Sequence, residues 1–288
     1  PSYQYVTKNG DTIDASKSGE HPLDENPLYV SEKTYWEKYY DHPFANYEWN
    51  NGKLEEKPPV ASMSKFSMYL WLIYLLKSYL LVHQNADMVG LEVGFRLVRR
   101  APVAGRRTTI RKPDMGVVRH DNPVPILPDD KTYRGIFDLC IESISDSNQE
   151  QIDRDTVDKF TEYAQAGVPE YYILDDHRNR HMEFYQLNAS GVYIPMPRTH
   201  GGDVIQSVVL PGFQFRISDL FRRPMPIQLV NDPIYQHFIL TEYQQERLRA
   251  QQEAQRARQE AQRAQQEFIR ANRYAEQLRA LGIDPDAI

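Results

Sequence analysis

The sequence contains little cysteine and no apolar segment typical of export or membrane insertion. Cys140 is the single cysteine among 288 residues, which excludes an internal disulfide framework and predicts a reducing, cytoplasmic location. The start of the chain is polar and lacks the apolar core of a signal peptide. The longest apolar run, 68–82, is interrupted by Lys77 and is shorter than the roughly 20 residues of a membrane-spanning helix. We therefore expect a buried core helix there, with no membrane partner.

Motifs of several enzyme classes are also missing. The glycine pair at 201–202 is isolated, so no glycine-rich loop is available to hold a nucleotide phosphate. His177 and His181 have no cysteine or acidic partner at zinc-site spacing. Ser143 has no histidine at a recognisable motif distance, and Cys140 lies in an apolar run without an activating neighbour. Nucleotide binding, zinc binding and covalent catalysis are therefore disfavoured.

The charge of the chain is unevenly distributed. The formal net charge of −6 argues mildly against an indiscriminate binder of nucleic acid. Between 96 and 112, however, every charged residue is basic: Arg96, Arg99, Arg100, Arg106, Arg107, Arg111 and Lys112. This stretch is either a solvated hairpin or an arm that contacts DNA phosphates, and charge alone leaves both interpretations open. Under the second, the nucleic-acid-binding residues are Arg106, Arg107, Arg111 and Lys112.

Composition divides the chain into four predicted segments. Residues 1–44 are polar with little periodicity, which indicates an N-terminal extension. Residues 45–222 alternate apolar strand-like runs with helical segments and form the predicted α/β domain. Prolines mark a linker at 223–240, and a helix with a heptad repeat follows at 241–282.

The α/β segment has a recognisable order of elements. It opens with a hairpin at 47–56, turned by Asn50-Asn51-Gly52, because Asn and Gly tolerate positive φ. A long helix ends near Val82, and a basic loop occupies 99–111. The remaining expected elements are strands at 89–98, 114–118, 137–144 and 171–174, a helix at 147–166, and an antiparallel meander at 182–187, 192–196 and 204–210.

The C-terminal helix carries a heptad seam made mostly of alanine. From Ala250 to Leu278 the seam residues alternate steps of four and three, which is a coiled-coil pattern. Alanine buries little apolar area, so we expect this helix to support association only weakly. The α/β domain would then supply the main contact of a homodimer.

Three residues carry a spacing suited to phosphodiester chemistry. Asp114 follows Pro113 at the start of a short strand, Glu142 closes the apolar run 136–141, and Lys159 lies in the next helix. Two carboxylates on neighbouring strands can hold Mg²⁺ or Mn²⁺, because these hard cations take oxygen ligands. A lysine beside them adds positive charge where a nucleophilic water or a phosphate would bind.

Two of these three assignments have an alternative. Asp114 could be a strand-end carboxylate bonded to backbone donors, and Lys159 could form a surface pair with Asp155 four residues earlier. Glu142 has no such simple alternative, because a carboxylate that closes an apolar run needs a cationic partner. Glu56 of the first hairpin is a candidate accessory metal ligand.

These motifs, in this order, resemble a known family. Residues 45–222 resemble the Uma-two family of "putative restriction endonucleases", which belongs to the PD-(D/E)XK nuclease superfamily. The similar segments are 47–56, Pro113-Asp114, 141–145, Asp155 with Lys159 and Tyr163, and 167–175, together with the end of the tail, 278–286.

The resemblance implies a fold and an activity. The implied fold is a restriction-endonuclease-like mixed sheet flanked by helices, with a C-terminal long helix or coiled coil. The implied reaction is hydrolysis of DNA phosphodiester bonds with Mg²⁺ or Mn²⁺, in which Asp114 and Glu142 hold the metal. The usual lysine two residues after the glutamate would fall at Ile144, and the family takes it from the following helix instead, which gives Lys159.

Two departures from the family support a different class of function. Ile144 cannot carry charge, and Lys65 stands where family members often have a histidine. Together with the heptad tail, they leave open an inactive nuclease fold that acts as a dimeric nucleic-acid-binding or scaffolding module.

Overall fold

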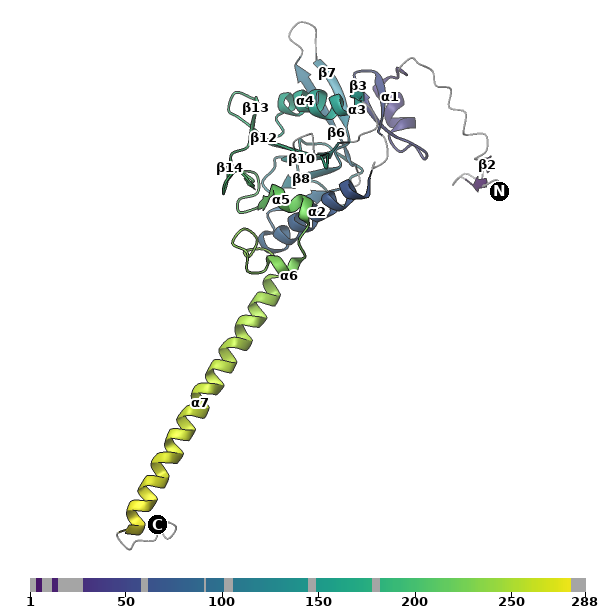
Figure 1. The fold of residues 1–288 in the computed structure, drawn as a ribbon. Coiled ribbons are helices and arrows are strands. Elements are labelled where there is room, and N and C mark those ends of the chain that lie inside the picture. The colour runs from purple at the N-terminus through teal and green to yellow at the C-terminus, as the bar shows by residue number, and fades with distance from the viewer. Residues whose placement is uncertain are drawn as a thin grey trace. The chain divides into compact units, whose positions relative to one another are not determined.

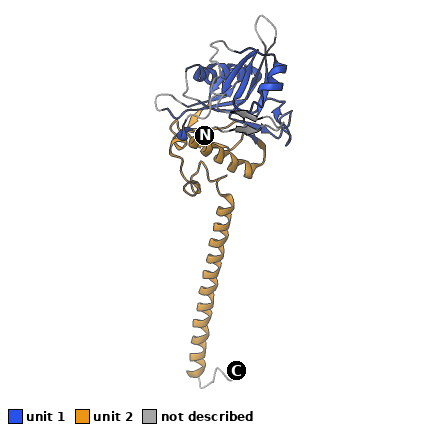
Figure 2. Cartoon of the chain, turned by 90° about the vertical axis from the view of Figure 1, so that its right-hand side faces the viewer, with its two compact units in different colours: residues 1–65, 88–195 blue, residues 66–87, 196–288 orange. Residues whose placement is uncertain are grey.

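The chain forms two compact units, each built from two separate stretches of sequence. The computed structural model describes residues 4–6, 12–14, 28–57, 62–90, 92–100, 106–144, 149–177 and 182–280, with the backbone alone at 4–6, 12–14, 99–100 and 106–107. Unit 1 contains Pro1–Lys65 and Met88–Pro195, and unit 2 contains Phe66–Asp87 and Met196–Ile288 (Figure 2). The elements form mixed sheets with helices and a long C-terminal helix (Figure 1), which confirms the expected α/β class.

A six-stranded mixed sheet carries two of the three predicted site residues. Its order is β13 (Tyr193–Pro195), β12 (Glu183–Leu187), β11 (Glu170–Leu174), β10 (Leu139–Ser143), β8 (Met115–Arg119) and β5 (Ala86–Val89). β10 runs parallel to β11 and antiparallel to β8. β11 is buried throughout, and β8 and β10 are buried except at their last residues. This explains their nearly continuous apolar sequences.

A five-stranded sheet lies beside it in unit 1. Its order is β4 (Lys53–Lys57), β3 (Asn46–Asn50), β7 (Arg106–Arg111), β6 (Gly94–Arg100) and β9 (Thr132–Tyr133). The turn between β3 and β4 has positive φ at Asn51 and Gly52, as predicted. The predicted basic loop is wrong over 106–111, because β7 pairs with β6 along its whole length. Its Thr108, Thr109 and Ile110 are β-branched and favour a strand.

Three helical segments join β10 to β11 and position Lys159. They are α3 (Gln149–Asp153), the π-helical turn η2 (Arg154–Asp158) and α4 (Lys159–Ala166). Gly167 ends α4 with a φ of 90°, a left-handed conformation that glycine adopts without strain. Within the core of unit 1, Tyr163 of α4 packs against Phe95 and Tyr171.

Part of the predicted N-terminal extension is folded into unit 1. The strands β1 (Gln4–Val6) and β2 (Thr12–Asp14) pair with each other, and α1 (Glu32–Thr34) leads into a π-helical turn, η1 (Tyr35–Tyr39). Tyr35 and Tyr40 are buried in a core cluster with Trp49. The prediction of a polar N-terminal extension is therefore wrong from about residue 28, because these aromatic side chains pack in a hydrophobic core.

Unit 2 contains a second set of elements. They are most of α2 (Met63–His83), a three-stranded sheet of β14 (Arg198–Thr199), β15 (Val204–Gln206) and β16 (Gln214–Arg216), α5 (Ile217–Arg222), α6 (Pro226–Leu229) and α7 (Thr241–Ala280). The predicted meander therefore divides: its first two strands join the sheet of unit 1, while β15 pairs with β14 and β16.

The segment 223–240 is folded and is not a solvent-exposed linker. Its apolar side chains are buried: Leu229, Val230, Ile234, Tyr235, Phe238 and Ile239. Tyr235 contacts Trp71 of α2 edge-on, and its hydroxyl donates to Asp219 of α5. The prolines therefore lie within a compact turn region of unit 2.

The two long helices of unit 2 differ in composition. By length and composition, α2 is long and apolar enough to cross a membrane, a test that core helices also pass. Trp71 and Tyr79 of α2 are buried and donate hydrogen bonds to carbonyls of unit 2. α7 forms one continuous helix (Figure 1), as predicted. None of its residues is buried.

Candidate active site

Asp114 and Glu142 lie side by side at one end of the six-stranded sheet. The antiparallel register pairs Ile141 with Met115, so Asp114 and Glu142 come next, opposite each other. Oδ2 of Asp114 accepts a hydrogen bond of 2.7 Å from the backbone N–H of Ser143. The Asp114 side chain is 24% exposed, whereas Glu142 is 2% exposed. The structure therefore brings the two predicted carboxylates together, with Asp114 nearer the solvent.

Lys159 reaches the same carboxylates from the start of α4. Its ammonium lies 2.9 Å from Oε1 of Glu142, 2.9 Å from Oδ1 of Asp155 and 3.6 Å from Oε1 of Glu48. The pair with Asp155 that we considered as an alternative is thus also present, but it is buried. Tyr163, one turn later, donates its hydroxyl to the same Oε1 of Glu142 at 2.9 Å. Two donors from α4 therefore fix this carboxylate.

Burial and neighbouring charges act in opposite directions in this cluster. Burial raises the pKa of Glu142 to about 8, although Lys159 and Lys57 oppose this shift. Burial also disfavours the charged form of Lys159, but Asp155 and Glu142 outweigh it, so the pKa of Lys159 is raised. Lys159 consequently stays charged at neutral pH, and its charge limits, but does not reverse, the rise in the pKa of Glu142.

Lys57 is a site residue that the sequence analysis did not predict. It ends β4, and its ammonium lies 2.9 Å from Oδ1 of Asp114 and 3.9 Å from Oε2 of Glu142. It also donates to the backbone carbonyl of Lys112 at 2.7 Å and lies 3.3 Å from Oε1 of Glu92. A positive charge therefore occupies the position between the two carboxylates.

The alternation of side chains along β4 explains why Lys57 enters the site and Glu56 does not. Successive side chains of a strand point to opposite faces, so Glu55 and Lys57 share the face that contacts Arg111 and Asp114. Glu56 is exposed on the other face. The prediction that Glu56 is an accessory metal ligand is wrong, because the structure directs it away from Asp114.

Arg111 is buried in a charge cluster and cannot contact DNA from this position. Its guanidinium is 0% exposed and pairs with Glu55 at 2.5 Å, Glu162 at 2.6 Å and Glu48 at 3.0 Å. These three carboxylates come from β3, β4 and α4, which enclose the guanidinium. The prediction that Arg111 binds phosphate is therefore wrong.

The side chain of Lys112 also forms its hydrogen bonds within unit 1. Its ammonium donates to the carbonyl of Tyr40 at 2.7 Å and to Oδ1 of Asn46 at 2.9 Å, and it lies over the Tyr40 ring. Burial lowers the pKa of Lys112. The prediction of a phosphate contact is wrong here too. The side chains of Arg106 and Arg107 lie outside the described residues, so their predicted contacts stay predictions.

The two departures from the family pattern are in contact. The ammonium of Lys65 donates to the backbone carbonyl of Ile144 at 2.8 Å and lies 3.7 Å from Asp176. Both Lys65 and Ile144 are buried. Lys65 therefore holds the end of the segment that carries Glu142.

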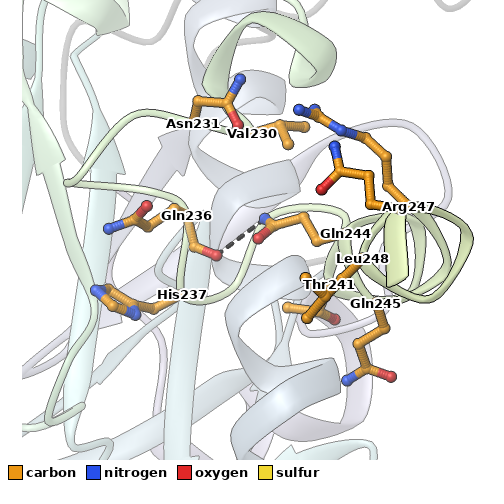
Figure 3. A pocket seen from close by; sticks show the side chains of 10 residues that line it. Val230, Asn231, Gln236, His237, Thr241, Gln244, Gln245, Arg247 and Leu248 are labelled. Atoms are coloured by element: carbon orange, nitrogen blue, oxygen red, sulfur yellow. Dashed lines mark hydrogen bonds between the residues drawn. The ribbon is translucent and has the colours of Figure 1, made fainter. Parts of the chain in front are cut away.

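Unit 2 contains a separate groove of about 480 Å³ at the base of α7 (Figure 3). Gln244 donates to the carbonyl of Gln236 across it. The lining residues are Val230, Asn231, Gln236, His237, Thr241, Gln244, Gln245, Arg247, Leu248 and Gln251. The groove has no carboxylate among these lining residues, so it lacks the ligands of a magnesium site.

The residues around Lys57 suit a hard cation. No group of three or more His, Cys, Asp or Glu suited to a metal ion occurs among the described residues. Mg²⁺, however, often binds through one or two carboxylates together with substrate phosphates. Asp114, Glu142 and the Lys112 carbonyl already surround one cation, the Lys57 ammonium. These oxygens are of the type that Mg²⁺ takes as ligands.

The fold and the paired carboxylates define an α/β protein with a candidate cation site, and comparison places it in a family. A family model described as "Uma2: Putative restriction endonuclease" matches residues 34–218, and the chain belongs to this family. The resemblance inferred from the sequence is thereby confirmed. No curated protein matches the sequence.

One solved structure similar to this chain is that of "a putative nuclease belonging to DUF820" from Anabaena variabilis ATCC 29413. The sequence identity is 15% and the TM-score is 0.41. The similarity covers 62% of this chain and 90% of the other.

Proposed function

We propose that this protein is a metal-dependent endonuclease that hydrolyses DNA phosphodiester bonds with Mg²⁺ or Mn²⁺. The observation that carries the proposal is the convergence of Asp114 and Glu142 with a buried lysine, Lys159. Membership of the family described as "Putative restriction endonuclease" supports the same reaction class.

The residues have distinct roles in this proposal. Asp114 and Glu142 would bind the cation through Oδ1 and Oε2, the atoms that face Lys57. When bound, the cation would stabilise charge on the scissile phosphate and lower the pKa of a water molecule. Lys159 and Tyr163 hold Oε1 of Glu142, which aims its other oxygen at the cation position. Lys159 thus acts as a positioning residue, and its charge opposes the rise in the pKa of Glu142 that burial causes.

DNA is the proposed substrate, and the remaining predictions belong to the same proposal. Arg106 and Arg107 are the candidate phosphate contacts in the β6–β7 hairpin. A homodimer in the cytoplasm is the proposed state of the protein.

A plasmid-nicking assay tests the reaction. We expect the protein to nick or linearise supercoiled plasmid with Mg²⁺ or Mn²⁺, and Glu142→Ala to abolish this activity. Glu150→Ala is the matched control, because Glu150 is 69% exposed and forms a surface pair with Lys53. Cleavage by Glu142→Ala at the rate of the wild type would reject the assignment.

A second candidate function is an inactive nuclease fold that binds nucleic acid or acts as a dimeric scaffold. The observation in its favour is the Lys57 ammonium, which pairs with Asp114 and lies close to Glu142. In that case the protein would bind DNA but would not cleave it with either Mg²⁺ or Mn²⁺.

A further inference from the structure

Lys57 has the surroundings of a bound cation. Its ammonium is within 3.3 Å of three oxygens, from the Lys112 carbonyl, Asp114 and Glu92, and Glu142 lies slightly further away. The side chain is 10% exposed. Carboxylate and carbonyl oxygens are also the ligands that divalent cations take.

The backbone of Lys57 is fixed, whereas its side chain is flexible. β4 pairs with β3, and the register sets Lys57 opposite Asn46. The four-carbon stem of lysine, by contrast, can rotate its ammonium as a compact point charge. Lysine carries a positive charge at neutral pH, and carboxylate and carbonyl oxygens surround this ammonium.

We propose that Lys57 is an internal cation that holds Asp114 and Glu142 together without metal and competes with a divalent ion for the same oxygens. This inference rests on the proposed metal-dependent function. The ammonium and a divalent cation repel each other, so they cannot share the position. Metal binding therefore requires the Lys57 ammonium to move. We expect it to move toward Glu92 and the solvent, because the Glu92 side chain is 38% exposed.

The displacement gives Lys57 a second partner in the substrate. An ammonium that leaves Asp114 can pair with a DNA phosphate, because lysine binds phosphate as a point charge. DNA would then stabilise the displaced state and so increase the affinity for the metal. Lys57 thereby couples metal loading to the presence of substrate.

Titration calorimetry with Mn²⁺ on the full chain, without DNA, tests the competition. If the displaced state is about a tenth of the population, Lys57→Met should bind Mn²⁺ about tenfold more tightly than the wild type. Lys53→Met is the matched control, because Lys53 lies on the same strand but pairs with Glu150 and Glu55. Its affinity should equal that of the wild type.

The opposite results would overturn the proposal. Equal or weaker binding by Lys57→Met, or no binding by either protein, would show that Lys57 does not compete with metal. Equal binding would leave the nuclease proposal intact, since plasmid cleavage by the wild type decides that proposal separately.

Thermal unfolding gives a second readout that does not depend on activity. In EDTA, Lys57→Met should melt below the wild type, because Asp114 and Glu142 lose a cationic partner. Mn²⁺ should then raise the Tm of the variant more than that of the wild type. If Lys57→Met fails to fold in EDTA, Lys57→Gln keeps a donor for the Lys112 carbonyl and should show the same order. An equal Mn²⁺ effect on wild type and variant would contradict the competition.

Discussion

Two charge clusters of unit 1 share residue types but differ in how completely they are closed. In the first, Arg111 pairs with Glu48, Glu55 and Glu162, and every side chain is at most 5% exposed. In the second, around Lys57, exposure rises to 24% at Asp114 and 38% at Glu92. The first has no route for a ligand, whereas the second has an open side.

The cations of the two clusters differ in the same way. Guanidinium is a rigid fork that holds carboxylates in a fixed geometry, whereas ammonium is a point charge on a flexible stem. Glu48 connects the two clusters: it pairs with Arg111, and it lies 3.6 Å from Lys159, which pairs with Glu142 beside Lys57. Although burial opposes ionisation, Lys159 and Arg111 lower the pKa of Glu48. We infer that the Arg111 cluster anchors the site and that the Lys57 cluster exchanges ions.

Removal of Arg111 should have the largest effect on folding. Arg111→Met would leave three carboxylates without their main partner, and breaking a buried pair costs about 3–5 kcal/mol. Denaturant unfolding should show a loss of this size in the free energy of unfolding. Arg96→Met is the control, because Arg96 is 48% exposed and pairs with Glu32, so a loss of about 0–1 kcal/mol is expected. An equal effect of both substitutions would remove the distinction between closed and open clusters.

Removal of Lys159 should act mainly on cleavage. Lys159→Met should bind DNA but cleave it about 100-fold more slowly, the usual cost of losing one preorganised charged group. Without Lys159 the pKa of Glu142 should rise further, so the loss should be greatest at low pH and smaller at high pH, where Glu142 ionises unaided. Single-turnover cleavage across pH measures this. Lys33→Met, at an 83% exposed position, should cleave normally; undiminished cleavage by Lys159→Met would reject the role.

Removal of a more exposed ion pair in unit 2 should have a smaller effect on the free energy of unfolding. Arg216 pairs with Asp232 at 2.6 Å, and their side chains are 27% and 24% exposed. Asp232→Asn should cost about 0–1 kcal/mol of unfolding free energy. Although burial opposes ionisation, the bond from Arg216 lowers the pKa of Asp232 below 3.8, so the contribution is present above that pH and is lost as the pH falls. A variant that matches the wild type at pH 7 and not at pH 2 would contradict this sign.

Removal of α7 should have the smallest effect on stability. α7 has no buried residue, so a chain ending at Leu240 should melt at the same temperature as the full chain. It should also remain a dimer by sedimentation, because the alanine seam buries little area. A monomeric truncated chain beside a dimeric full chain would show that the coiled coil drives association.

Local sequence patterns located Asp114, Glu142 and Lys159. The other site residues depend on pairing between strands that are distant in sequence. The apolar runs before Glu142 and after Asp114 define their strands, so both carboxylates could be located from sequence. Lys57 is not predicted from sequence because β4 is mostly polar, and only the pairing of β4 with β3 determines which of its side chains face the site. Arg111 resembles the other basic residues of 96–112 in sequence, and only its carboxylate partners from β3, β4 and α4 identify it as a buried anchor.

Anomalous diffraction from Mn²⁺-soaked crystals tests the central claim most directly. For both the wild type and Lys57→Met, we predict a peak bonded to Oδ1 of Asp114 and Oε2 of Glu142 at roughly the 2.1 Å expected for such a cation. In the wild type the Lys57 ammonium should have moved toward Glu92. The absence of a peak between these carboxylates in both proteins, with Lys57 still in place in the wild type, would contradict the account.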